Sequence, residues 1–176
     1  MASYSHHRSD WSTFEQAAPE VVAALGMLGK AVDHAGLDKI LTELIKLRAS
    51  QLNGCAFCLQ FHLNVARKAG LASAKIDLVA TWRDAGIYSG REAAALAWTE
   101  ALTLMAQQPI PDALYDEVST LFTSQEMIFL TSAIGAINAW NRIAGALQFA
   151  PPLPREAQNT PFRISLFAQE AAGRQA

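Results

Sequence analysis

Residues 43–62 read ELIKLRASQLNGCAFCLQFH, and this stretch decides the fold because it holds the end of one helix, a break and the start of another. Before the break, apolar residues recur at helical spacing, which predicts a helix over residues 38–52. Asn53-Gly54 then predicts the break, since Asn and Gly tolerate turn conformations that other residues resist. A second helix is expected from Cys55 to Gly70.

Residues that start and stop helices predict five more helices along the rest of the chain. Their ends are marked by capping residues, glycines and prolines, which start or stop helices for steric and hydrogen-bonding reasons. These helices run from a Ser12–Glu15 capping region through Pro19 to near Gly36, from Ser73 to before Gly86, from a Ser89–Glu92 capping box to Pro109, briefly from Pro111-Asp112, and from a Thr123–Glu126 capping box through an apolar stretch. The last of them is apolar on nearly every side, which is typical of a central core helix. We therefore predict an all-α bundle of about seven helices.

The two ends of the chain differ in composition from this helical part. After Ala150 the sequence PPLPREAQNTPFRISLF holds four of the seven prolines, which predicts an extended C-terminal arm over residues 151–176. The arm could lie on its own core or on a neighbouring subunit, and Phe162–Phe167 is the one segment whose pattern could form a strand. Residues 1–11 are expected to be a flexible N-terminus, and residues 1–176 a single domain.

Composition excludes several classes of protein. With 51% hydrophobic and 17% charged residues, the chain is too apolar to be disordered. A formal net charge of −2 offers no electrostatic footprint for nucleic acid. The N-terminus lacks the apolar region of a secretion signal, so we expect a cytoplasmic protein. Polar residues interrupt the most apolar stretch, Met127–Leu147, which favours a buried helix over a membrane span.

Cys55, Cys58 and His62 are the candidate reactive residues. They are three and four positions apart, so on one helix they project from the same face. Both cysteines fall in the first turns of the expected helix, where unpaired N–H groups and the helix dipole favour a thiolate. Two thiols at this spacing can close a disulfide, so a sulfenic acid formed on one sulfur would be captured by the other.

A proton relay can be built beside these thiols. His62 lies one turn beyond Cys58, where it could accept or pass on a proton. A carboxylate on the preceding helix could orient its ring, and Glu43 is the candidate. The approach of Glu43 depends on how the two helices pack, which spacing alone does not determine.

Two other interpretations of the cysteine pair are open. Buried cysteines often act as small hydrophobic residues. A zinc ion on Cys55, Cys58 and His62 would need a fourth ligand, and no second Cys/His pair follows. The remaining histidines are His6, His7 and His34. We expect neither a metal nor a cofactor.

Several further residues are expected to serve the fold. Trp98 is expected to anchor the core and Glu100 to be a surface charge. Arg48 could pair with Glu43 only weakly, because a gap of five residues aligns poorly on a helix. Polar residues on one face of the last helix need partners and are expected to be mainly structural, with the active-site entrance or a subunit interface as alternatives: Asn138, Asn141 and Arg142.

The spacing Glu43, eleven residues, Cys55, two residues, Cys58, three residues, His62 resembles the AhpD-like alkylhydroperoxidases of the carboxymuconolactone decarboxylase superfamily. The segments RASQLNGCAFC, ARKAGL, ALAWTEAL and INAWNR are also similar to small, stand-alone members of that family. The sequence departs from the best-studied branch at Phe57, where that branch has a second histidine. Decarboxylase members typically lack the cysteine pair, so decarboxylase chemistry is not expected.

This resemblance implies an all-helical AhpD-like fold, assembly as a homo-oligomer (trimer or hexamer) and a thiol peroxidase cycle. By the same resemblance Cys58 attacks the peroxide, Cys55 resolves the sulfenic acid as a disulfide, and Glu43 and His62 relay protons. We therefore expect a peroxidase that reduces alkyl or hydrogen peroxides and is recycled by a dithiol, such as a lipoyl group. The alternatives are a thiol–disulfide reductase or redox sensor and, in a different class, a non-catalytic oligomeric binding protein.

Overall fold

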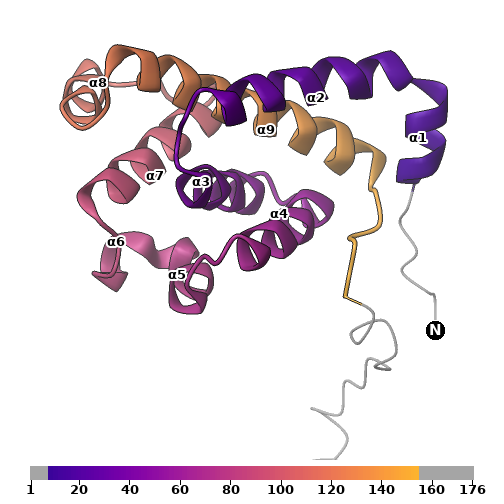
Figure 1. Cartoon of the computed structure of the whole chain (residues 1–176), viewed down its shortest axis with the longest axis horizontal. Coiled ribbons are helices and arrows are strands. Elements are labelled where there is room, and N and C mark those ends of the chain that lie inside the picture. The colour runs from indigo at the N-terminus through magenta and orange to yellow at the C-terminus, as the bar shows by residue number, and fades with distance from the viewer. Residues whose placement is uncertain (1–7, 155–176) are drawn as a thin grey trace, which may run out of the picture.

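The computed structural model of the chain describes residues 8–154, and within them the protein is all-α, without a β-strand. Nine α-helices and one 3₁₀ turn follow one another in this part of the chain (Figure 1). The elements are α1 (Trp11–Ala17), α2 (Pro19–His34), α3 (Lys39–Leu52), α4 (Ala56–Lys68), α5 (Ser73–Leu78), η1 (Val79–Thr81), α6 (Trp82–Ala85), α7 (Gly90–Thr103), α8 (Asp112–Ser119) and α9 (Ser124–Leu147).

Helix α3 lies at the centre of the molecule and packs against α4, α7 and α9 (Figure 1). Its buried side chains point in several directions, including Glu43 and Ser50 as well as the apolar residues. The sequence pattern assigns the central position to the last helix, and this is only half correct. Helix α9 is long, but only eight of its 24 residues are buried. Ile128, Gly135 and Arg142, which lie on one side of the helix, are exposed, so one of its faces is uncovered.

The break between α3 and α4 lies where the sequence predicts it. Asn53 ends α3, and Gly54 adopts φ +63°, in the left-handed region that favours glycine. Both predicted capping boxes are present: Ser89 with Glu92 begins α7, and Thr123 with Glu126 begins α9. Local hydrogen bonds determine these three boundaries, which is why the sequence shows them.

The N-terminal region differs from the prediction. The predicted capping region at Ser12–Glu15 is wrong, because Asp10 caps α1 by accepting a hydrogen bond from the backbone N–H of Thr13. Helix α2 is a separate element that starts at Pro19, since the residue before a proline is disfavoured in the helical conformation. Within the segment predicted to be flexible, the backbone N–H groups of Arg8 and Ser9 donate to the carbonyl of Leu147 at the end of α9.

Two predicted helices end early or break. Instead of one helix, residues 73–85 form α5, η1 and α6, because the buried side chains are Ile76, Val79 and Trp82. A spacing of three suits a 3₁₀ turn better than an α-helix. Helix α7 stops at Thr103 rather than near Pro109, because residues 105–109 are exposed and have no core to pack against.

The start of the predicted C-terminal arm contacts α4. Residues 151–154 have no regular structure, and the side-chain amide of Asn64 donates to the carbonyl of Pro152 at 3.0 Å. The remainder of the arm, including the possible strand at Phe162–Phe167, lies outside the described residues. Among the helices of residues 8–154, none is long and apolar enough to cross a membrane.

Candidate active site

The cysteine pair lies at the start of α4, directly after the Asn53-Gly54 break. Cys55 is the N-cap residue, and its Sγ accepts a hydrogen bond from the backbone N–H of Cys58 at 3.3 Å. The two Sγ atoms are 2.7 Å apart, and both residues are buried, with 2% and 3% exposure. The local geometry therefore brings two sulfurs within reach of a bond at the positive end of a helix.

The two thiols titrate as a pair. The hydrogen bonds from the Cys58 thiol and from the Cys58 backbone N–H together lower the pKa of Cys55 to about 7, against the effect of burial. The same thiol–thiol hydrogen bond, together with burial, raises the pKa of Cys58. One proton is therefore released near neutral pH, and the two sulfurs share a single negative charge.

The packing of α3 on α4 brings Glu43 to His62. His62 Nδ1 lies 2.7 Å from Glu43 Oε2, and the carboxylate is 1% exposed. The other oxygen, Glu43 Oε1, accepts from Lys46 Nζ at 2.9 Å and Lys39 Nζ at 3.1 Å. The predicted proximity of Glu43 and His62 is thus present, whereas the two lysines were not considered. They lie at i−4 and i+3 from Glu43, and this helical spacing could have revealed them.

The contacts of Glu43 and His62 determine the charge of each side chain at neutral pH. Burial acts to raise the pKa of Glu43, but the hydrogen bond with His62 and the charge of Lys46 outweigh burial and lower it to about 2. Burial lowers the pKa of His62, although the hydrogen bond with Glu43 opposes this. His62 is therefore neutral at pH 7. Its Nδ1–H donates to the carboxylate, and Nε2 is the basic nitrogen of the ring.

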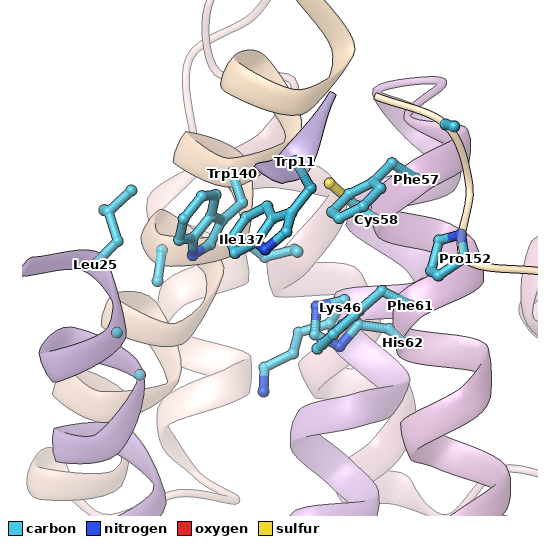
Figure 2. Close-up of a pocket in the computed structure, with 14 residues that line it drawn as sticks. Trp11, Leu25, Lys46, Phe57, Cys58, Phe61, His62, Ile137, Trp140 and Pro152 are labelled. Atoms are coloured by element: carbon cyan, nitrogen blue, oxygen red, sulfur yellow. The ribbon is translucent and has the colours of Figure 1, made fainter. Parts of the chain in front are cut away.

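A cavity of about 610 Å³ opens beside these residues, and its wall includes Cys58, His62 and Lys46 (Figure 2). Cys55 is not part of the wall. The other lining residues are nearly all apolar and come from α1, α2, α4, α9 and the start of the arm: Trp11, Leu25, Gly26, Gly29, Phe57, Phe61, Ala136, Ile137, Trp140, Ala150 and Pro152. Cys58 therefore faces a space that can hold an apolar molecule.

Phe57 belongs to an aromatic wall of this cavity. Its ring stacks on Trp11, with centroids 5.9 Å apart, and on Phe61 at 6.4 Å. Trp11 also contacts Trp140 at 5.8 Å, so it bridges α4 and α9 (Figure 2). Sequence reasoning missed both tryptophans, because residues 11 and 140 meet only when α1 folds back onto α9.

Glu100 is not the surface charge that the sequence predicts. Its side chain is 12% exposed and accepts from Arg48 Nε at 2.6 Å and Trp82 Nε1 at 2.9 Å, and Arg83 is a further partner. Arg48 therefore pairs with Glu100 rather than with Glu43. Trp98 does anchor the core: it is 5% exposed, and its Nε1 donates to Thr131 Oγ1.

The polar residues of α9 have partners within the protein. Asn138 and Asn141 bond to the end of α3, whereas Arg142 is exposed and bonds back to Asn138. This agrees with the structural roles expected for them. Within residues 8–154, no group of three or more His, Cys, Asp or Glu side chains could hold a metal ion.

The chain belongs to the carboxymuconolactone decarboxylase family, as an AhpD-like member: the family model matches residues 19–101. An uncharacterized protein of Bacillus subtilis (strain 168), YdfG, is 35% identical over 135 residues, which cover 77% of this chain and 92% of YdfG. A protein of unknown function from Agrobacterium tumefaciens, proposed to be the antioxidant defence protein AhpD, has a known crystal structure and is 37% identical to this chain. It aligns with a TM-score of 0.79 over 84% of this chain and 99% of that chain.

A more distant structure shows the fold alone. The debrominase Bmp8 aligns with a TM-score of 0.66 at 20% identity, over 77% of this chain and 73% of Bmp8. These relatives agree with the all-α, AhpD-like fold that the sequence predicts.

Proposed function

We propose that the protein is a thiol-dependent peroxidase in which Cys58 attacks the peroxide and Cys55 resolves the product. The observation that carries this proposal is the pair of sulfurs 2.7 Å apart, of which only Cys58 lines a cavity shared with His62. The hydrogen bond between the thiols lets the shared proton move to Cys55, which leaves the thiolate on Cys58. Cys58 is therefore the nucleophile because it lines the cavity, even though Cys55 has the lower pKa of the two thiols.

Each step of the cycle balances with groups in the site. The Cys58 thiolate attacks the distal oxygen of ROOH, so the O–O bond breaks, Cys58 becomes a sulfenic acid, and RO⁻ takes a proton to leave as ROH. His62 Nε2, which carries no proton in the resting site, takes up from solvent the proton that the thiol pair released and delivers it to RO⁻, while Glu43 holds the ring in the required tautomer. The Cys55 thiol then attacks the Cys58 sulfenic sulfur and releases water as the disulfide forms.

The cavity favours an organic hydroperoxide over hydrogen peroxide. A space of about 610 Å³ is far larger than hydrogen peroxide requires. Its apolar walls make the transfer of an apolar group from water into the cavity favourable. The nearby charges also balance, since Lys46 pairs with Glu43, and Lys39 bonds to Asp33 as well as to Glu43. We therefore propose a neutral hydroperoxide with a bulky apolar substituent as the preferred substrate.

A dithiol returns the disulfide to two thiols. Two thiol–disulfide exchanges transfer two electrons and two protons from the donor, which leaves as its own disulfide. Both cysteines are at most 3% exposed, and only Cys58 lines the cavity, so we expect the donor to reach Cys58 through the cavity. A slender dithiol on an alkyl chain, such as a lipoyl group, fits this route. The cytoplasm, where we expect the protein to act, keeps dithiols reduced.

Thiol titration tests this function directly. Reduced protein treated with one equivalent of cumene hydroperoxide should lose two thiols per chain, and dihydrolipoamide should restore both. Cys58→Ser should lose the reaction, whereas Cys55→Ser should react once and then proceed to irreversibly oxidised sulfur under excess peroxide. Unreactive wild-type thiols would indicate a non-catalytic binding protein. Disulfide exchange without peroxide reduction would indicate a thiol–disulfide reductase.

We also propose that the protein forms a homo-oligomer, a trimer or hexamer, with α2 in the interface. Helix α2 packs mainly on α9 and leaves three large apolar side chains exposed: Val21 (43%), Met27 (64%) and Leu28 (38%). Exposed large apolar side chains on one helix favour a surface that a second copy covers. Light scattering at micromolar concentration should give a multiple of 19.0 kDa, and Met27→Glu should lower it. A monomeric wild-type protein would contradict this assembly.

A further inference from the structure

A group of three asparagines joins α9 to the end of α3, close to the cysteine pair. Asn53 Nδ2 lies 3.0 Å from the backbone carbonyl of Ala49 and 2.9 Å from the Oδ1 atoms of both Asn138 and Asn141. The backbone N–H of Cys55 donates to the carbonyl of Ser50, at the same end of α3. The asparagine group and the turn that carries Cys55 are therefore both fixed to the end of α3.

The hydrogen bonds determine which way the Asn141 amide faces. A backbone carbonyl only accepts, so the atom of Asn53 that faces Ala49 must be its NH₂ group. The Asn141 atom that faces this NH₂ group must then be oxygen. The Asn141 NH₂ group consequently points the other way, where it donates to Ser50 Oγ at 3.1 Å.

The second N–H of Asn141 is available to the sulfurs. Asn141 is 3% exposed and lies on the face of α9 between Ile137 and Ala144, and both of these residues pack in one cluster with Cys55 and Cys58. The thiol of Cys58 is the main cause of the lowered pKa of Cys55, and the Asn141 side chain adds to it as a further hydrogen-bond partner. The thiol of Cys55 and burial raise the pKa of Cys58, and a hydrogen bond with Asn141 opposes this rise. Asn141 thus approaches the pair from α9, whereas the backbone N–H of Cys58 approaches it from α4.

We propose that Asn141 is a thiolate-binding residue, which donates an N–H to the charge shared by Cys55 and Cys58 and holds the reduced pair ready to react. A buried anion is costly unless donors surround it. The backbone N–H of Cys58 supplies one donor, and Asn141 supplies one from a different helix. This inference rests on the proposed thiol chemistry of the site, although its measurement requires no peroxide.

Two variants of Asn141 separate binding of the thiolate from packing. Asn141→Leu removes the amide at similar volume. Asn141→Asp keeps the oxygen that accepts from Asn53 but replaces the donor that faces the sulfurs. In both variants, the absorbance of the thiolate at 240 nm should titrate about 1 to 2 pH units higher than in the reduced wild type. Alkylation by iodoacetamide at pH 7 should slow about tenfold or more.

Asn138→Leu is the matched control, because it removes an amide from the same helix and the same asparagine group without a sulfur contact. Its thiolate titration should follow the wild type. An unchanged titration in Asn141→Asp, or an equal change in Asn138→Leu, would overturn the proposal.

The wild-type protein provides a test that does not depend on folding of a variant. The side-chain NH₂ resonances of Asn141, observed by ¹⁵N NMR, should shift with pH through the thiolate titration, and those of Asn64 should not. Asn141 resonances that do not respond to ionisation would also overturn the proposal. A confirmed shift in a protein that consumes no peroxide would leave thiolate binding intact and reject the peroxidase function.

Discussion

Two glutamates, the buried Glu43 and the partly buried Glu100, have nearly the same set of partners. Each carboxylate accepts from two cationic side chains and from one ring N–H: His62 at Glu43 and Trp82 at Glu100. Each carboxyl has a lowered pKa because these hydrogen bonds outweigh burial. The two carboxylates therefore have the same kinds of hydrogen-bond partner and the same direction of pKa shift.

The two sites differ in whether the ring that donates to the carboxylate can also exchange a proton with a second group. Imidazole has a second nitrogen that can take and release a proton, and His62 lines the cavity beside Cys58. Indole has a single nitrogen, which only donates, so the chain of hydrogen bonds ends at Trp82. A buried carboxylate with cations is thus not in itself a sign of catalysis. The titratable ring and the nearby nucleophile make the difference, and three predictions test it.

The largest expected difference is in activity. Glu43→Gln leaves His62 without a charged partner for its Nδ1–H, so peroxide reduction should fall about 100-fold or more. Glu100→Gln changes a group with no route to the cysteines, and its activity should stay within about twofold of the wild type. Steady-state assays with cumene hydroperoxide measure both. Equal losses in the two variants would contradict the division into a proton relay and a structural cluster.

A second expected difference lies in acid stability. The pKa of Glu43 is about 2 in the folded protein, against an ordinary value of 4.5, so the folded state holds the carboxylate more strongly than the unfolded chain does. Its contribution to the free energy of unfolding is full above pH 4.5 and is lost as the pH falls towards 2. The contribution is on the order of 3 kcal/mol.

Urea unfolding of the wild type and Glu43→Gln between pH 7 and pH 2 measures this loss. The stability difference between the two proteins should shrink by about that amount over the acid range. Glu100→Gln should show the same direction with a smaller change, since Glu100 is more exposed than Glu43. A difference between wild type and Glu43→Gln that does not vary with pH would contradict the lowered pKa.

The smallest expected effect concerns the ring at Glu100. Trp82→Phe removes the N–H donor but keeps an aromatic ring in the core, and the charged partners of Glu100 remain. The free energy of unfolding should fall by about 1 to 3 kcal/mol, with activity unchanged. Thermal unfolding beside a peroxide assay checks both halves. A loss of activity beyond the loss of folded protein would mean that the Glu100 cluster is coupled to the cysteines.

Local hydrogen bonds explain how much of the fold could be predicted. The Asn53-Gly54 break and the capping boxes at Ser89 and Thr123 involve residues within a few positions of one another, and all three lie where the sequence places them. The sequence did not predict that residues 73–85 divide into α5, η1 and α6, because this division depends on which of their side chains are buried in the core.

The sequence by itself determined that the chain is helical, that two thiols lie at a helix start, and that His62 is one turn away. Helix geometry requires these features whatever the helices pack against. Only the tertiary structure decided that Glu43 meets His62 while Arg48 turns to Glu100, and that Trp11 and Trp140 close a cavity over Cys58. Those contacts join residues far apart along the chain, and their distances depend on how α1, α3, α4 and α9 pack, which no local spacing encodes.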